Sequence, residues 1–149
     1  MRNFSKVKRV VIKIGTNTLS KDGGIDTAYV NRIARQISWL METKRQVLLV
    51  SSGAIGMGAG LLDIQGKIRT TKMRQACAAI GQPLLMQEYR KAFNRCNVKI
   101  AQVLLTTEVL NHRKTYLNLK NSIETLLKLG VVPVINENDT VMVEEIQFG

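Results

Sequence analysis

The chain has 149 residues, of which 45% are apolar and 22% are charged, and it carries a formal net charge of +11. This length and balance are typical of one globular domain and exclude a disordered chain. No run approaches the roughly 18 consecutive apolar residues that a membrane helix needs, and residues 1–15 lack the apolar run and cleavage site of a signal peptide.

The positive charge raises nucleic acid as a partner, but its distribution disfavours one. Basic residues scatter from Arg2 to Lys128 without a long run, and three Phe and three Tyr leave few rings to stack on bases. After Lys128 all the charged side chains are acidic: Glu137, Asp139, Glu144 and Glu145. We expect neither a nucleic-acid nor a membrane partner, and a surface that attracts small anions fits the charge equally well.

Two cysteines and one histidine limit the possible chemistry. Cys77 and Cys96 form no CxxC pair and are expected to be small apolar residues in a reducing compartment, so we expect a cytoplasmic protein. His112 is the only histidine, which disfavours a histidine metal site or a serine–histidine triad. We therefore assign no metal-ligating residue.

The first third of the chain predicts a strand, a helix and a second strand. Residues 9–14 (RVVIKI) are rich in β-branched residues and end at Gly15, which indicates a buried strand. Asp26 is placed to cap a helix over 27–44, and residues 46–50 (QVLLV) predict the next strand. Apolar residues recur at helical spacing in this helix: Val30, Ile33, Ile37, Leu40 and Met41.

Residues 50–60 (VSSGAIGMGAG) follow the second strand and contain four glycines, which is typical of a loop whose backbone approaches a ligand. The segment has neither the GxxxxGK[ST] of a Walker A loop nor GxGxxG nor GxSxG. Ser51 and Ser52 can be explained as the N-cap of a helix that starts near residue 53. Such a helix would also present its positive end to a carboxylate or phosphate.

The rest of the chain continues the alternation of helices and strands. A polar stretch over 63–72 leads into a helical segment over about 71–95, which we expect Gly81 and Pro83 to interrupt. The elements predicted after it are a strand over 98–105, a helix over 113–129 that stops at Gly130, a strand over 131–136 with Pro133 inside it, and a strand or hairpin over 140–149.

This order predicts an α/β fold, with a mainly parallel sheet between helices on both faces. Ligands of such sheets bind at the carboxyl ends of the strands. Three of the four predicted ends carry polar or glycine residues suited to a site: Lys13 to Thr16, Ser51 to Ala54, and Asn136 to Asp139.

Two of these ends have both a structural and a functional interpretation. Lys13 can be a lysine of an edge strand that extends to water, but beside Gly15 and Thr16 it is better explained as a phosphate-binding lysine. Residues 136–139 (NEND) can be a capped turn, or acceptors for an ammonium group or a metal, and the residues alone leave both open.

Five blocks, VVIKIGTNTLS, LLVSSGAIGMGAG, QACAAIGQPLLM, QVLLT and VVPVINENDTV, occur in this order. Together they closely resemble the glutamate 5-kinases, a family of the amino acid kinase superfamily. The resemblance runs collinearly from about residue 8 to residue 149, and it implies the αβα sandwich of that superfamily.

The resemblance implies transfer of the ATP γ-phosphoryl group, with Mg²⁺, to the side-chain carboxylate of L-glutamate, the first step of proline biosynthesis. Proline is implied as a feedback inhibitor. Lys13 matches the lysine that stabilises the transferring phosphoryl group, and Gly15 and Thr16 line the phosphate path. The implied glutamate-binding residues are Ser52, with Gly53 and Ala54 beside it, and Asp139, which holds the amino group, with Asn136 and Asn138 in the same segment.

By the same resemblance, residues 1–149 correspond to the N-terminal, amino-acid-binding part of the kinase domain. The nucleotide-binding half and a C-terminal PUA domain would lie beyond Gly149, so we expect the fold to be incomplete at its C-terminus and the fragment to be inactive alone. Apolar residues near the end favour self-association, and we expect a homo-oligomer. The alternative is a non-catalytic remnant that binds glutamate, proline or a partner protein.

Overall fold

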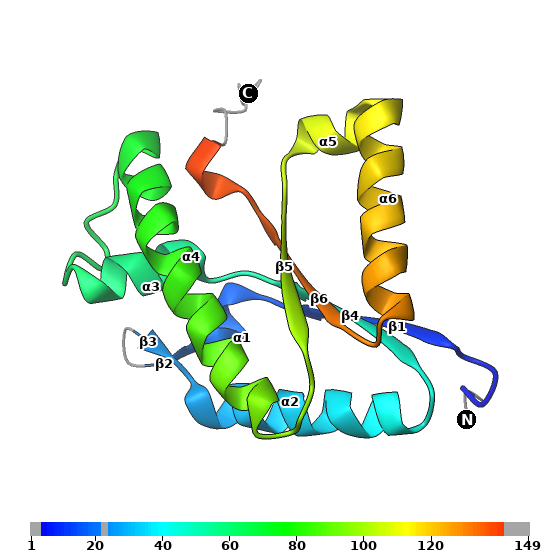
Figure 1. Cartoon of the computed structure of the whole chain (residues 1–149). Coiled ribbons are helices and arrows are strands. Elements are labelled where there is room, and N and C mark those ends of the chain that lie inside the picture. Colours follow the sequence, from blue (N-terminus) through cyan, green and yellow to red (C-terminus); the bar gives the residue numbers. More distant parts are fainter. Residues whose placement is uncertain (1–3, 22–23, 142–149) are drawn as a thin grey trace.

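The computed structural model describes residues 4–21 and 24–141, and Figure 1 shows how their elements are arranged. Four parallel strands form the main sheet in the order β1-β4-β6-β5. These strands are β1 (Arg9–Ile14), β4 (Gln46–Ser51), β6 (Val132–Glu137) and β5 (Ile100–Leu105). The four strands predicted for this sheet are confirmed, with ends that differ by at most two residues.

The helices are α1 (Thr16–Leu19), α2 (Thr27–Glu42), α3 (Ala54–Leu61), α4 (Thr71–Asn94), α5 (Thr107–Asn111) and α6 (Arg113–Lys128), followed by the 3-10 turn η1 (Asp139–Val141). A small antiparallel pair, β2 (Ser20–Lys21) with β3 (Gly24–Ile25), lies between α1 and α2 in the chain. The pair and the short helices α1 and α5 were not predicted.

Helices cover both faces of the main sheet, as predicted. On one face, Ile14 packs in a common core with side chains of α2 and α4, including Val30 and Leu85. On the other face, Arg9 of β1 pairs with Glu124 of α6, with 2.8 Å between the guanidinium and a carboxylate oxygen. Because successive residues of a strand point to opposite faces, these contacts place α2 and α4 on one side of the sheet and α6 on the other.

Helix α2 forms as its sequence predicts. The Asp26 carboxylate accepts a hydrogen bond of 2.9 Å from the backbone N–H of Tyr29, which satisfies one of the unpaired donors of the first turn. The side that faces the sheet is buried: Val30, Ile33, Ala34 and Ile37. The helix ends at Glu42, two residues earlier than predicted, and Lys44 adopts a positive φ of 61° in the turn that follows.

The prediction that Gly81 and Pro83 interrupt the second long helix is wrong. Helix α4 runs through both residues for 24 residues. Pro83 lies on the exposed side of the helix, one turn after Ala79. The carbonyl of Ala79 lacks a helical N–H donor because proline has none, but on this exposed side water can take that place. Gly81 lies on the buried side, where a Cβ would overlap the carbonyl oxygen of Ala54. The helix therefore tolerates the proline and requires the glycine for close packing.

The expectation that residues 50–60 form an open ligand loop is also wrong for most of the segment. Ser51 ends β4, and helix α3 already begins at Ala54. Gly53 makes the turn with a φ of 101°, a conformation that favours glycine. Gly58 lies against α4, where a Cβ would overlap the carbonyl oxygen of Cys77. The predicted helix start near residue 53 is confirmed, and the close packing of α3 on α4 explains one of the glycines.

Pro133 lies inside β6, between two neighbouring strands. The backbone N–H of Val132 donates to Lys99 on the β5 side, so the nitrogen of Pro133 faces β4. The pairing of β6 with β4 begins only at Val134, opposite Leu49. The missing N–H of the proline therefore removes no bond of the β4–β6 ladder.

Helices of the described residues are all too short or too polar to cross a membrane. Both cysteines are free: Cys77 is buried and Cys96 is half-buried, consistent with the predicted small apolar role. The predicted strand or hairpin over 140–149 lies almost entirely outside the described residues, and its first two positions belong to η1.

Candidate functional site

The register of the sheet brings three predicted strand ends to one edge. Ile14 pairs with Ser51, and Val50 pairs with Ile135, so Ser51 is level with Asn136. Neighbouring strands lie about 4.8 Å apart. The residues that follow β1, β4 and β6 therefore lie side by side at the carboxyl edge, where parallel sheets bind their ligands.

Lys13 lies one residue before this edge and is exposed, whereas its neighbour Ile14 is only 2% exposed. It pairs in register with Val50, so its side chain projects from the face that carries α6. No hydrogen bond or ion pair of Lys13 is found within residues 4–21 and 24–141. Val11, on the same face of the edge strand β1, is also exposed, so this face of the strand is uncovered within the described residues. The ammonium group is available to an anion.

Gly15 and Thr16 join β1 to α1. Gly15 has an ordinary φ of −80° and caps the helix without a side-chain hydrogen bond. A Cβ at Gly15 would meet no atom of the described chain within 4 Å. The backbone here is therefore open on the side where a side chain would stand, and the first N–H groups of the helix lack partners within it.

The turn after β4 presents backbone rather than side chains. Gly53 caps α3, and its carbonyl accepts a bond of 3.0 Å from the N–H of Met57. Ala54 is only 3% exposed, so its methyl group belongs to the core and it can offer a ligand only its N–H. Ser52 is half-buried beside these first N–H groups of the helix. The segment is suited to an anionic group.

The turn after β6 is held from two sides. The N–H of Asn138 donates to the carbonyl of Leu105 at the end of β5, at 2.7 Å, and the N–H of Val141 donates to Asn138. Asn136 is 6% exposed, and its Oδ1 accepts a bond of 2.9 Å from the N–H of Glu137. The side chain of Asn136 therefore bonds to the backbone within β6 itself rather than capping the turn that follows.

Asp139 begins η1 and is half-buried. Burial raises the pKa of its carboxyl above the ordinary aspartate value, the nearby charge of Glu137 raises it further, and Arg74 of α4 opposes both. Two carboxylates with one arginine near them form a site that a further positive charge, such as an ammonium group, would stabilise.

Sequence reasoning missed a set of buried polar side chains beneath this edge. Asn136 donates from Nδ2 to Oε1 of Gln82 at 2.8 Å, and Nε2 of Gln82 donates to Oε1 of Gln102 at 3.0 Å. Ser51 Oγ lies 2.7 Å from the hydroxyl of Tyr89, which is fully buried. Burial raises the pKa of Tyr89 to about 12, against the effect of Ser51, so the phenol keeps its proton at neutral pH.

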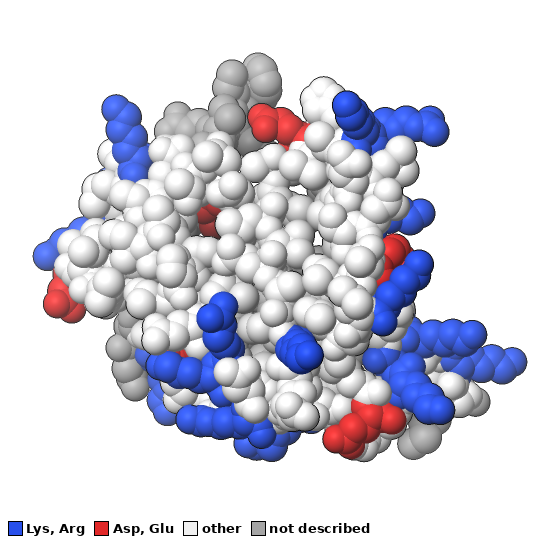
Figure 2. Space-filling view, in the orientation of Figure 1, with Lys and Arg blue, Asp and Glu red and all other residues white. Residues whose placement is uncertain are grey.

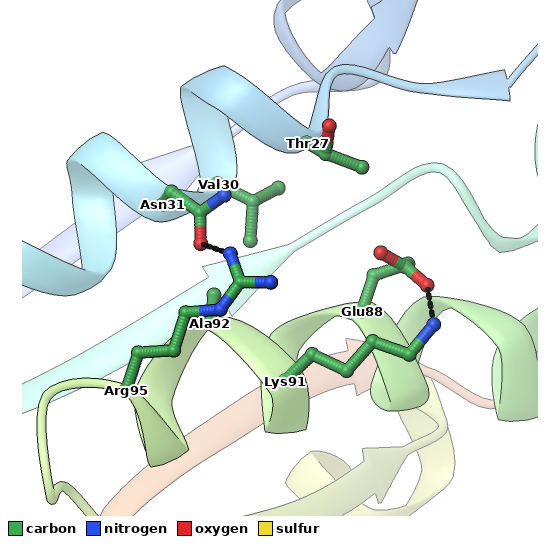
Figure 3. Close-up of a pocket in the computed structure, with 7 residues that line it drawn as sticks. All are labelled: Thr27, Val30, Asn31, Glu88, Lys91, Ala92 and Arg95. Carbon is green, nitrogen blue, oxygen red and sulfur yellow. Dashed lines mark hydrogen bonds and ion pairs between the residues drawn. The ribbon is translucent and has the colours of Figure 1, made fainter.

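Two hollows lie away from the strand ends. One, of about 230 Å³, lies between α2 and α4, and Figure 3 shows that its charged side chains already have partners: Arg95 bonds to Asn31 and Lys91 to Glu88. The other, of about 500 Å³, is mainly apolar and lies beside β1 and the end of α2, with Val11 and Trp39 in its lining. Figure 2 shows the basic residues of one face scattered along its edges, with a few on its lower half, rather than gathered in a stripe.

Comparison with known proteins gives one family. A model of the amino acid kinase family matches residues 8–149. Curated relatives called glutamate 5-kinase are 48% identical over 97% of this chain in Methanosarcina mazei, 48% over 98% in Desulfotalea psychrophila and 50% over 98% in Pelobacter propionicus. The chain spans 40%, 39% and 39% of the length of these three relatives.

Proposed function

The chain belongs to the amino acid kinase family, and from this membership we propose that it is the acceptor-binding part of an ATP-dependent glutamate 5-kinase. The reaction would phosphorylate the side-chain carboxylate of L-glutamate to glutamyl 5-phosphate, the first step of proline biosynthesis. The observation that carries the proposal is the near-50% identity to glutamate 5-kinases along almost the whole chain. The aligned strand ends support it, because they offer groups for both an anion and an ammonium.

Lys13 is proposed as the catalytic lysine, whose charge stabilises the transferring phosphoryl group. Gly15 and Thr16 would bind phosphate oxygens through the backbone. The open surroundings of Gly15 support this role, because a phosphate can approach a backbone that no Cβ shields. Removal of one such charge-stabilising donor costs about 10²–10³-fold in turnover in other enzymes.

The glutamate would lie along the same edge, against the turns after β4 and β6. Ser52, Gly53 and Ala54 would bind a carboxylate through the hydroxyl and the first N–H groups of α3. Asp139 would hold the α-amino group, and Asn136 and Asn138 would shape the same turn. Asp139 is half-buried, with a raised pKa, which supports a partner of positive charge.

The chemistry needs no general base. A glutamate side chain has a reference pKa of about 4.3, so the attacking carboxylate is already ionised at neutral pH. The difficulty is to bring this anion against a polyphosphate. Lysine, backbone donors and helix ends meet it by positioning and by charge stabilisation.

ATP and Mg²⁺ are the proposed cofactors. The lysine and N–H donors fit phosphate oxygens. In residues 4–21 and 24–141 no three His, Cys, Asp or Glu side chains cluster as a metal site, but Mg²⁺ binds largely through waters and substrate phosphates. We therefore propose that Mg²⁺ is held mainly by the phosphates of ATP, whose charge it would help to neutralise.

Inhibition, assembly and location complete the proposal. Proline carries the same α-carboxylate as glutamate and a charged α-nitrogen, so it can compete for the same contacts as a feedback inhibitor. We further propose a cytoplasmic homo-oligomer.

The test uses the complete gene product with ATP, Mg²⁺ and glutamate, and measures ADP together with the acyl phosphate trapped as a hydroxamate by hydroxylamine. Aspartate, one methylene shorter, is the control acceptor. ADP and hydroxamate that both depend on glutamate support the proposal. Glutamate binding without ADP formation would instead establish the non-catalytic alternative, and ADP formation independent of glutamate would contradict the assigned acceptor.

A further inference from the structure

Helix α4 is hydrogen-bonded to two of the strand ends from beneath. Gln82 reaches Asn136 at the end of β6, and Tyr89 reaches Ser51 at the end of β4. Gln82 and Tyr89 are seven residues apart, which is two helical turns, so they lie on the same face of the helix. One rigid element therefore contacts both turns that would bind glutamate.

In the contact between Gln82 and Asn136, the backbone N–H of Glu137 fixes how both side-chain amides are oriented. The N–H of Glu137 donates to Oδ1 of Asn136, which leaves Nδ2 of Asn136 to donate to Oε1 of Gln82. Gln82 must then donate from its own Nε2, and it does so to Gln102. Both Gln82 and Asn136 are at most 9% exposed, so water competes little for these bonds.

The second contact fixes the neighbouring turn in the same way. The hydroxyl of Ser51 lies 2.7 Å from the hydroxyl of Tyr89, and it also lies 3.2 Å from the carbonyl oxygen of Ser52. Helix α4 also meets the start of α3 directly, because Gly81 lies against the carbonyl of Ala54. Residues 51–54 thus contact α4 through a side chain and through the backbone.

We propose that Gln82 and Tyr89 are positioning residues that set the distance between the two halves of the glutamate site. Neither is a catalytic residue: Gln82 orients the turn of Asn136 to Asp139, and Tyr89 orients Ser51 and Ser52. This inference rests on the proposed function. It goes beyond it because Gln82 and Tyr89 belong to no strand end.

The consequence is a selective loss of glutamate affinity. Gln82→Met keeps the length of the side chain but leaves Asn136 without its acceptor. Loss of one buried hydrogen bond that orders the turn is expected to raise the KM for glutamate about tenfold, while the KM for ATP stays within about twofold. A merely structural role would reduce the folded fraction and hence the turnover number, without moving one KM relative to the other.

The experiment compares Gln82→Met with Gln87→Met in the complete gene product. Gln87 lies on the exposed side of the same helix, so its variant controls for the substitution itself. Tyr89→Phe removes only the hydroxyl and is expected to raise the KM for glutamate as well, with Tyr116→Phe, at an exposed position, as its control. Hydrogen exchange at the Glu137 N–H reports on the turn independently of activity.

The inference is supported if Gln82→Met shows faster exchange at the Glu137 N–H and a raised KM for glutamate, and if Gln87→Met shows neither. Unchanged exchange in Gln82→Met, or an equal rise in the KM values for glutamate and ATP, would overturn it. If Gln82→Met does not fold, Tyr89→Phe decides: a raised KM for glutamate with an unchanged KM for ATP supports the inference, and an unchanged KM for glutamate overturns it. A parent protein with no glutamate-dependent turnover overturns the proposed function and this inference with it, whereas an active parent with an unaffected Gln82→Met variant overturns the inference alone.

Discussion

Alanine at Gly56 and alanine at Gly58 are the same substitution in the same eight-residue helix, yet opposite effects on stability are expected. Both glycines lie in α3. A Cβ at Gly56 would meet no atom of the described chain within 4 Å, whereas a Cβ at Gly58 would overlap the carbonyl oxygen of Cys77 in α4. Only the second substitution forces the two helices apart.

The size of the difference follows from two terms. Alanine is favoured over glycine within a helix by about 0.5–1 kcal/mol, and Gly56→Ala should gain that amount. Gly58→Ala gains the same but adds an overpacking cost of about 3 kcal/mol, the upper end of the usual range, because the overlapped atom is backbone and cannot rotate away. Its net loss is about 2 kcal/mol, which leaves about 3 kcal/mol between the two variants.

Thermal unfolding of the complete gene product measures this difference. At 2–4 °C per kcal/mol, the scaling of domains of 150–250 residues, the midpoints should differ by roughly 6–12 °C, with the parent between them. The parent itself is the control for both variants. Equal midpoints, or a Gly58→Ala variant more stable than the parent, would refute the close approach of α3 and α4.

Three other predictions follow from single side chains. Lys13→Ala should lower kcat in the ADP assay about 10²–10³-fold with glutamate affinity unchanged, and an unaltered turnover would contradict its assignment. Asp139 must be ionised to bind an ammonium, and its pKa is raised above the ordinary aspartate value, so the KM for glutamate should begin to rise at a higher pH, as the solution is acidified, than it would for an ordinary aspartate. Asp139→Asn should remove that pH dependence. It should not lower the stability at neutral pH, because a raised pKa means that ionisation of Asp139 disfavours the fold. A parent enzyme whose KM for glutamate does not change with pH would contradict the assigned role of Asp139. Asp26→Ala removes the cap on the Tyr29 N–H and should cost about 1 kcal/mol in a urea titration, whereas an unshifted midpoint would show that the cap contributes nothing.

Sequence patterns predicted the four strands of the main sheet and the two amphipathic helices because each is long enough to show its period. The pair β2–β3 and the helices α1 and α5 have two to five residues each, too few for a period to appear. Their existence depends on contacts with the rest of the chain.

The error at Pro83 shows where local propensity fails. Proline inside a helix costs about 3 kcal/mol, which favours a break when the residue is considered alone. Beyond it, α4 buries Leu85, Tyr89 and Phe93 almost completely. At about 1.5–3 kcal/mol each, these side chains contribute together about 5–9 kcal/mol. Tertiary packing therefore outweighs the local cost.

The candidate site divides in the same way. Polar residues at strand ends can be found from sequence, because the strand pattern shows where each strand stops. Gln82 could not be found so, since its partner Asn136 lies 54 residues away and a lone glutamine in a helix indicates a solvated surface. The one hint in the sequence is the spacing: Gln82 lies seven residues before Tyr89, which places both side chains on the same face of a helix.

Four glycines of the described chain separate into three that the fold requires and one that it does not. Gly58 and Gly81 are required by helix packing, and Gly53 by its positive φ. Gly15 has neither reason: its φ is ordinary and, within the described residues, nothing would touch a side chain there. Helix capping does not explain it either, because serine, asparagine or aspartate caps a helix better. A ligand that approaches the backbone between Lys13 and Thr16 accounts for glycine at this position, which supports the proposal that phosphate oxygens bind there.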